Sequence, residues 1–130
     1  MKFSKKTLLA CALQFALAGG ALCAPASIEV DADLMRGIDD TAKGLDSDIS
    51  QQDGHAAVEA RELVDTFAKI EAHYADKPET ADAAGFAHRT QALAAQTLKA
   101  IEAKDFDAAG DAVAQLTRSC KSCHEVYKKD

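Results

Sequence analysis

Two cysteines and a histidine near the C-terminus have the residue types and the spacing for covalent cofactor attachment. They lie in the run Cys120-Lys121-Ser122-Cys123-His124. This C-x-x-C-H order is typical of c-type haem attachment, in which each thiol adds to one vinyl group of the porphyrin. The adjacent imidazole, that of His124, can then bind the iron as the proximal ligand. The motif therefore predicts one covalent haem c per chain, with iron porphyrin as the reactive part of the protein.

Two other uses of a C-x-x-C pair fit this sequence less well. A redox-active dithiol needs its nucleophile at a helix N-terminus, where the helix dipole lowers the thiol pKa. Cys120 and Cys123 instead fall in the last turns of an expected helix. A structural zinc site needs two further ligands at a suitable spacing, and the sequence contains neither a second C-x-x-C nor an H-x-x-x-H. A haem-free thiol or zinc protein is therefore disfavoured.

Residues 1–26 have the pattern of a secretory signal peptide. Three lysines precede an apolar run over residues 7–18, and Ala24-Pro25-Ala26 supplies an A-x-A cleavage site. The run is too short and wrongly flanked for a membrane span. We therefore expect cleavage after Ala26, which leaves a single small domain of 104 residues, 27–130.

Removal of the leader changes the composition of the domain that folds. Two of the four cysteines, Cys11 and Cys23, leave with it, so Cys120 and Cys123 remain as the only thiols. Three of the 15 basic residues and none of the 21 acidic residues lie in the leader, so the net charge changes from −6 to −9. A chain this acidic does not bind nucleic acid or an anionic membrane through bulk charge. Export together with haem attachment indicates the bacterial periplasm.

Apolar residues recur at steps of three and four in four segments, which is the period of amphipathic helices. The first segment runs from Ile28 to Ser50, and breaks follow at Asp53-Gly54, Asp76-Lys77-Pro78 and Lys104-Asp105. The stripes are Met35, Ile38, Ala42, Leu45 and Ile49; Ala56, Ala60, Leu63, Phe67, Ile70 and Tyr74; Ala83, Phe86, Ala87, Thr90, Leu93, Ala94, Thr97 and Ile101; and Phe106, Ala109, Val113, Leu116, Cys120, Cys123 and Tyr127. We expect Thr80 and Asp105 to cap the third and fourth helices.

Four such helices joined by short connections predict an all-α fold, an antiparallel up-down-up-down four-helix bundle. Cys120 and Cys123 both belong to the fourth stripe, so the haem is expected inside the bundle. Many stripe positions are alanine, and the chain has no tryptophan. Either a large flat ligand fills part of this core, or alanine permits close helix packing. Gly37 and Gly44 also indicate a close approach to the first helix, because glycine otherwise destabilises a helix.

Two stretches near the C-terminus, Asp105 to Ala109 and Ser119 to Lys128, resemble the last helix of the class II c-type cytochromes, the cytochrome c′ family. Tyr127 lies three residues after His124, and a basic residue follows it, as in that family. The helical pattern extends the likeness over residues 27–130, although the first three helices match mainly in periodicity. The resemblance implies thioether links to Cys120 and Cys123, proximal ligation by His124, and periplasmic electron transfer or gas binding, often as a homodimer.

The resemblance does not assign the distal side of the iron. Arg36 directly follows Met35, whereas the family's distal residue usually follows an arginine by several positions, and the connection between the second and third helices is shorter than in relatives. In an up-down-up-down bundle the first helix starts where the fourth ends. Met35, about two turns into the first helix, would then lie level with His124.

Met35 is therefore the candidate distal ligand, and its thioether would raise the reduction potential. The alternative is that Met35 only fills the core. With no distal ligand, Leu34, Met35 and Ile38 would form an apolar lid over five-coordinate iron. The other histidines are weaker candidates: His55 lies about 30 Å away at 1.5 Å per residue, and His73 and His88 fall off the apolar stripes.

These features predict an electron carrier rather than an enzyme, with iron that cycles between the ferrous and ferric states. The alternative is a five-coordinate protein of the cytochrome c′ type that binds nitric oxide or carbon monoxide in an apolar pocket. A basic patch would dock redox partner proteins by a salt-sensitive encounter, although cations also favour a helix C-terminus. It consists of Arg118, Lys121, Lys128 and Lys129.

Overall fold

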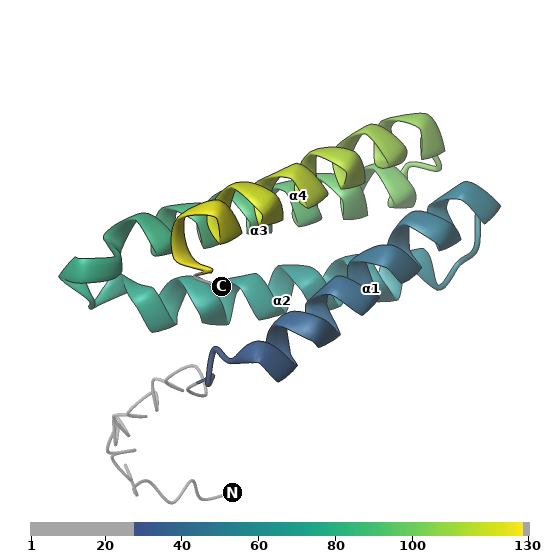
Figure 1. The fold of residues 1–130 in the computed structure, drawn as a ribbon. Coiled ribbons are helices and arrows are strands. Elements are labelled where there is room, and N and C mark those ends of the chain that lie inside the picture. The colour runs from purple at the N-terminus through teal and green to yellow at the C-terminus, as the bar shows by residue number, and fades with distance from the viewer. Residues whose placement is uncertain (1–27, 129–130) are drawn as a thin grey trace, which may run out of the picture.

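The computed structural model describes residues 28–128, so the leader assigned to residues 1–26 lies outside the described residues. The described chain forms α1 (Ala32–Gln51), α2 (Ala56–Ala75), α3 (Ala81–Glu102) and α4 (Phe106–Tyr127), with the short 3-10 turn η1 (Pro78–Thr80) before α3. Figure 1 shows the four helices packed side by side. The prediction of an all-α fold built from four mutually packed helices is confirmed. Over residues 28–128, no helix has the length and apolar character that crossing a membrane requires.

The first helix begins later than the segment that the sequence assigns to it. The carboxylate of Asp31 accepts a hydrogen bond from the backbone N–H of Leu34 at 2.8 Å, which makes Asp31 the N-cap and Ala32 the first helical residue. The expected start at Ile28 is therefore wrong by one turn. Met35 lies in the first turn of α1, rather than about two turns into the helix. At the other end, Gln52 has a positive φ of 56° and closes the helix.

The breaks between the later helices lie where the sequence places them. The side chain of Asp105 accepts a hydrogen bond from the backbone N–H of Ala108 at 3.0 Å, so the predicted cap of α4 is confirmed. Thr80 precedes α3 but makes no side-chain cap, because its hydroxyl donates to the carbonyl of Lys77 at 3.4 Å. Pro78 opens η1, where its fixed φ fits and its missing N–H costs nothing.

The core follows the predicted stripes and excludes water most completely in the middle of the bundle. Leu45, Leu63, Val113 and Leu116 are at most 1% exposed. Seven alanines of α2, α3 and α4 are buried to the same degree or nearly so: Ala56, Ala60, Ala83, Ala87, Ala94, Ala109 and Ala112. Protein atoms alone cover these alanines, which indicates that they permit close helix packing rather than leave room for a ligand.

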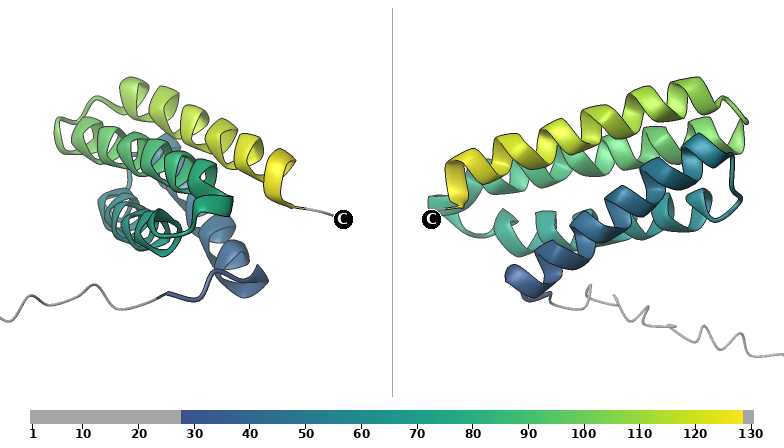
Figure 2. Two further views of the ribbon diagram at one scale, coloured as in Figure 1. Left: turned by 90° about the vertical axis from the view of Figure 1, so that its left-hand side faces the viewer. Right: turned by 45° about the vertical axis from the view of Figure 1, so that its right-hand side comes forward.

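The four helices do not contribute equally to this core. The interfaces between α2 and α3 and between α3 and α4 are extensive, whereas α1 has smaller interfaces with α2 and α4. Figures 1 and 2 show that α1 is inclined to the other helices, so that its N-terminal end lies apart from the C-terminal end of α4. The least covered end of the bundle is therefore the end that carries the C-x-x-C-H run.

Candidate functional site

Cys120 and Cys123 lie in the last two turns of α4, one helical turn apart on the same face. Both side chains are partly buried and neither forms a disulfide. Cys120 packs against the hydrophobic core, where Leu116, one turn earlier on the same stripe, is fully buried. The two thiols thus face inward at the end of the bundle.

Each of the other three helices places a polar group near these thiols. Asp39 in α1 lies close enough to Cys120, and Arg89 in α3 close enough to Cys123, for their charges to affect the pKa values of the two thiols. Burial raises the pKa of the Tyr74 phenol at the C-terminal end of α2, and a nearby thiolate at Cys123 would raise it further. The C-terminal turns of α4 therefore lie among residues from α1, α2 and α3.

The environment of the two cysteines disfavours their thiolate forms. Burial, with a smaller contribution from the charge of Cys123, raises the pKa of Cys120 from 9.0 to about 11. Burial also raises the pKa of Cys123, and the positive charge of Arg89 opposes this effect. A catalytic dithiol requires the opposite, a pKa lowered toward neutrality. The pair is thus poorly suited to thiol redox catalysis, in agreement with the expectation from the sequence.

Apolar side chains around the motif are less well covered than those in the middle of the bundle. Leu34, Met35, Tyr74 and Phe86 are only partly buried. Val126 and Tyr127, in the last turn of α4, are 56% and 37% exposed. Apolar groups that gather at one end without full cover mark a surface where a partner or ligand binds. Beside the two thiols, these residues therefore offer apolar surface to a partner or ligand.

His124 is exposed in this structure. Its backbone carbonyl accepts a hydrogen bond from the N–H of Lys128 at 2.9 Å, which closes the helix. Among the described residues its imidazole has no hydrogen-bond partner, so both ring nitrogens are available to a metal. The placement beside Cys123 is the one that the motif requires.

Met35 is half-buried and packs against the core from the first turn of α1. Its helix is the one whose N-terminal end is inclined away from α4 (Figure 2). Leu34 and Ile38 line a hollow of about 180 Å³ against Leu63 of α2, and neither thiol borders this hollow. The structure therefore places Met35 at the motif's end of the bundle but turns the proposed lid partners toward α2.

The other histidines at this end of the bundle already have polar partners. His73 is half-buried, with Nε2 2.7 Å from Nζ of Lys77, and its ring meets the Tyr74 ring edge-on at 4.9 Å. His88 is exposed, with Nδ1 3.1 Å from a carboxylate oxygen of Glu71. Neither side chain belongs to the buried core, as the sequence pattern indicates.

The expected basic patch is exposed in its described part, which consists of Arg118, Lys121 and Lys128, and Lys129 lies outside the described residues. The structure adds Arg89 of α3, which sequence reasoning missed. Its guanidinium carbon lies 4.6 Å from the centre of the Phe86 ring, a cation–π distance. Only the packing of α3 against α4 brings Arg89 near Cys123, so no local signal in the sequence marks it.

No family model, curated protein or solved structure matches this chain. The function is therefore inferred from the residues and their arrangement.

Proposed function

We propose that this protein is an exported monohaem c-type cytochrome that acts as an electron carrier and resembles the cytochrome c′ family. One observation carries the proposal. The two thiols of the C-x-x-C-H run face inward, one turn apart, at an end of the bundle where apolar side chains are incompletely covered. Alternative roles for such a pair need a lowered thiol pKa or further soft ligands. The described residues near Cys120 and Cys123 provide neither.

The residues of the proposed site have distinct roles. Cys120 and Cys123 would anchor haem c through thioether bonds, and His124 would be the proximal iron ligand. The haem supplies a couple between ferrous and ferric iron. Met35 is the candidate distal ligand, and Phe86 would exclude water from one edge of the site. The antiparallel up-down-up-down order is part of this proposal, because it brings α1 and the motif to the same end.

The location and the partners follow from the same features. We place the protein in the periplasm, since residues 1–26 have the pattern of a cleaved leader. Arg118, Lys121 and Lys128, together with Arg89, would dock an acidic redox partner through a salt-sensitive encounter. Surface charges steer such an encounter without holding the complex, which suits a carrier that must release its partner after electron transfer.

The first test is maturation of the full chain in a bacterial host that attaches c-type haem. We expect a haem stain to survive denaturing electrophoresis and to disappear in the double variant Cys120→Ser, Cys123→Ser. The control variant is Ser122→Ala, which changes an exposed residue inside the motif and should keep the stain. A wild-type protein that is exported but carries no covalent haem would refute the proposal.

The inclination of α1 away from the end of α4 favours one alternative, a five-coordinate haem that binds nitric oxide or carbon monoxide (Figure 2). Absorption spectra before and after addition of carbon monoxide separate the two functions. Low-spin bands, a weak long-wavelength ferric band and indifference to carbon monoxide would support a six-coordinate carrier with Met35 and His124 as ligands. High-spin bands that shift at once with carbon monoxide would support the gas-binding protein.

A further inference from the structure

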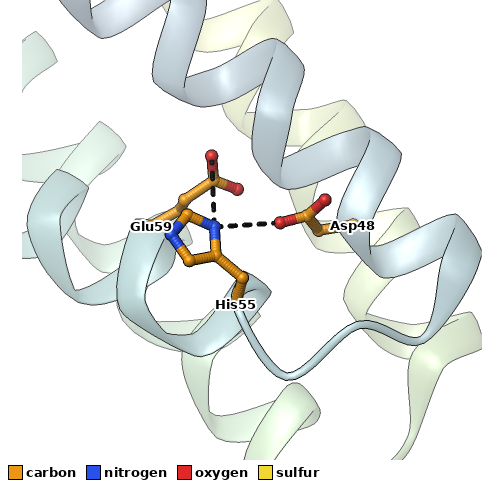
Figure 3. Close-up of side chains that lie close together, drawn as sticks. All are labelled: Asp48, His55 and Glu59. Carbon is orange, nitrogen blue, oxygen red and sulfur yellow. Dashed lines mark hydrogen bonds and ion pairs between the residues drawn. The ribbon is translucent and has the colours of Figure 1, made fainter.

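Three side chains with metal-ligating atoms converge at the end of the bundle opposite the thiols. Asp48 comes from the last turns of α1, His55 directly precedes α2, and Glu59 lies one turn into α2. Nδ1 of His55 lies 3.0 Å from Oδ2 of Asp48 and 3.8 Å from Oε1 of Glu59. Figure 3 shows the imidazole between the two carboxylates, and one ligating atom from each residue lies within 4.8 Å of the others.

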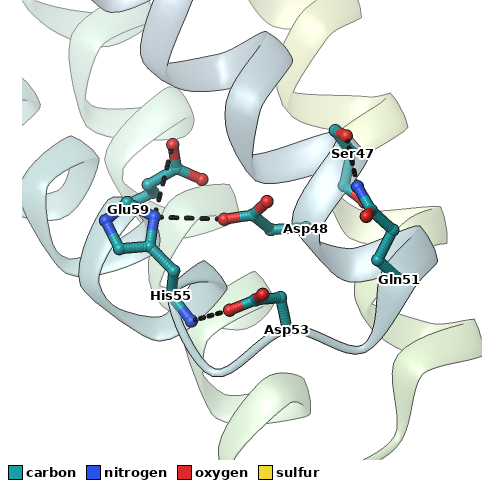
Figure 4. A network of polar contacts seen from close by, with 6 residues as sticks. All are labelled: Ser47, Asp48, Gln51, Asp53, His55 and Glu59. Atoms are coloured by element: carbon teal, nitrogen blue, oxygen red, sulfur yellow. Dashed lines mark hydrogen bonds and ion pairs between the residues drawn. The ribbon is translucent and has the colours of Figure 1, made fainter.

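The turn between α1 and α2 fixes the position of His55. The backbone carbonyl of Asp48 accepts hydrogen bonds from the N–H groups of Gln52 and Asp53, which closes α1 in a tight reversal. The side chain of Asp53 then accepts from the backbone N–H of His55 at 2.8 Å (Figure 4). The hydrogen-bonded turn therefore carries the imidazole back over the end of α1, so the site is built on ordered backbone.

Glu59 has the least exposed side chain of the group. Its side chain is only 14% exposed, and Oε2 is inaccessible to solvent and has no hydrogen-bond partner. The carboxylate lies directly against Gly44 of α1, where a Cβ atom would be 3.2 Å from Cδ of Glu59 and closer still to Oε1. Gly44 thus provides the room for this carboxylate between the two helices. This contact is the close approach to the first helix that Gly44 indicated, whereas a Cβ atom on Gly37 would meet no neighbour within 4 Å.

A carboxylate oxygen without a partner is costly to bury, and a cation bound beside it would relieve this cost. Burial is the main cause that raises the pKa of Glu59, and the negative charge of Asp48 adds to it, while His55 opposes the shift. Glu62 contributes a further small increase. Two convergent carboxylates in an acidic protein therefore give this group of side chains an excess of negative charge.

The geometry points to a binding site for a divalent transition-metal ion, with Zn²⁺ as the best match, held by Asp48, His55 and Glu59. Ligand atoms bound at about 2.0–2.2 Å from a tetrahedral zinc lie about 3.3–3.6 Å apart. The separations of 3.0 and 3.8 Å from Nδ1 bracket this range. An imidazole with two carboxylates suits zinc, whereas magnesium and calcium prefer oxygen ligands alone.

This inference is independent of the proposed haem. Its competitor is a protonated His55 that simply pairs with the two carboxylates, and the two explanations predict different behaviour toward metal.

The test uses the tag-free domain as isolated from the periplasm, stripped with a chelator and desalted. Any free thiols are first alkylated, so that zinc cannot bind to the C-x-x-C pair. Zn²⁺ is then titrated in competition with a chromophoric indicator, and the imidazole nitrogens are followed by NMR.

We expect one Zn²⁺ per chain and a shift of the Nδ1 resonance of His55. Loss of even an outer-shell partner typically costs about 10–100-fold in metal affinity, so His55→Gln, Asp48→Asn and Glu59→Gln should each weaken binding by more than about tenfold. Gly44→Ala should also weaken binding, because the new methyl group displaces the carboxylate of Glu59. The matched control is His88→Gln, which removes another imidazole paired with a carboxylate, at 3.1 Å from Glu71, and should leave zinc binding unchanged.

Absence of stoichiometric zinc binding to the wild-type domain would overturn the inference. So would binding that survives His55→Gln, since another set of ligands would then hold the ion. Circular dichroism checks that each variant is folded. If a variant unfolds, the NMR shift of His55 Nδ1 in the wild-type protein decides the question: a shift at one equivalent of Zn²⁺ supports the site, and an unchanged resonance overturns it.

Discussion

The burial of Cys120 predicts that its thiol reacts unusually slowly in the folded, haem-free domain. A pKa of about 11 instead of 9.0 reduces the thiolate fraction at neutral pH by about 100-fold. The more basic thiolate is intrinsically more nucleophilic, and a Brønsted coefficient of about 0.4–0.5 restores about 6- to 10-fold. The folded protein should therefore react with a disulfide reagent about 10- to 16-fold more slowly than the unfolded chain, before any steric protection is counted.

The assay follows the release of thionitrobenzoate from Ellman's reagent. The variant Cys123→Ser reports on Cys120 alone, and the same variant in guanidinium chloride provides the unperturbed rate. Cys120→Ser reports on Cys123, whose pKa is also raised by burial but is lowered by the charge of Arg89. We expect Cys123 to react faster than Cys120, and both rates to rise steadily with pH. If Cys120 in the folded domain reacts as fast as in denaturant, the proposed burial is refuted. Thiol redox catalysis by Cys120 and Cys123 would then again be a candidate function.

Three further perturbations test other parts of the molecule. Leu116 is fully buried, so Leu116→Ala should destabilise the domain by about 2–5 kcal/mol in urea unfolding. The exposed control Val58→Ala should change stability by less than about 0.5 kcal/mol. In the haem-loaded protein, Met35→Ala should lower the reduction potential and produce a high-spin spectrum, and an unchanged potential would show that Met35 is not a ligand. In metal-free protein, the pKa of Glu59 is raised above its ordinary value of 4.5, so above pH 4.5 the folded state keeps a proton that the unfolded state has lost. The free energy of unfolding should therefore fall as pH rises above 4.5, until the pH passes the raised pKa of the folded state. Glu59→Gln should remove this decline of stability with pH. If the decline persists in the variant, another titrating group causes it.

Local features of the sequence were sufficient to predict the helices. A period of three and four residues locates each helix, and Asp105 is a cap because its carboxylate reaches a backbone N–H only three residues ahead. The start of α1 was misplaced because the apolar residues Ile28 and Val30, which precede the cap at Asp31, were included in the helical segment. An aspartate just before the first residue of an apolar stripe is itself a signal for the start of a helix. At such a boundary, this signal and the neighbouring apolar residues indicate different starts.

The candidate sites likewise combine features that local spacing in the sequence predicts with contacts that only the packing of the helices creates. The spacing of Cys120 and Cys123 is local, so a helix places both on one face whatever surrounds it. Arg89 and Tyr74 approach these thiols only through the packing of α2 and α3 against α4, which no spacing encodes. His55, which the sequence places far from the C-x-x-C-H run, is 61% exposed. Its contacts with Asp48 and Glu59 depend on how tightly the chain turns between two helices.

The weaker attachment of α1 gives the bundle a part that can open by itself. The free energy of local opening depends on the apolar contacts that a segment buries, so α1 should detach at lower cost than α2, α3 or α4. Its amide hydrogens should accordingly exchange with solvent before those of the other helices. In the proposed haem protein, detachment of α1 would withdraw Met35 and leave α4, which carries Cys120, Cys123 and His124, in place. A ligated carrier and an open gas-binding haem would then be two conformations of one protein, and the opening of a single helix would set the balance between them.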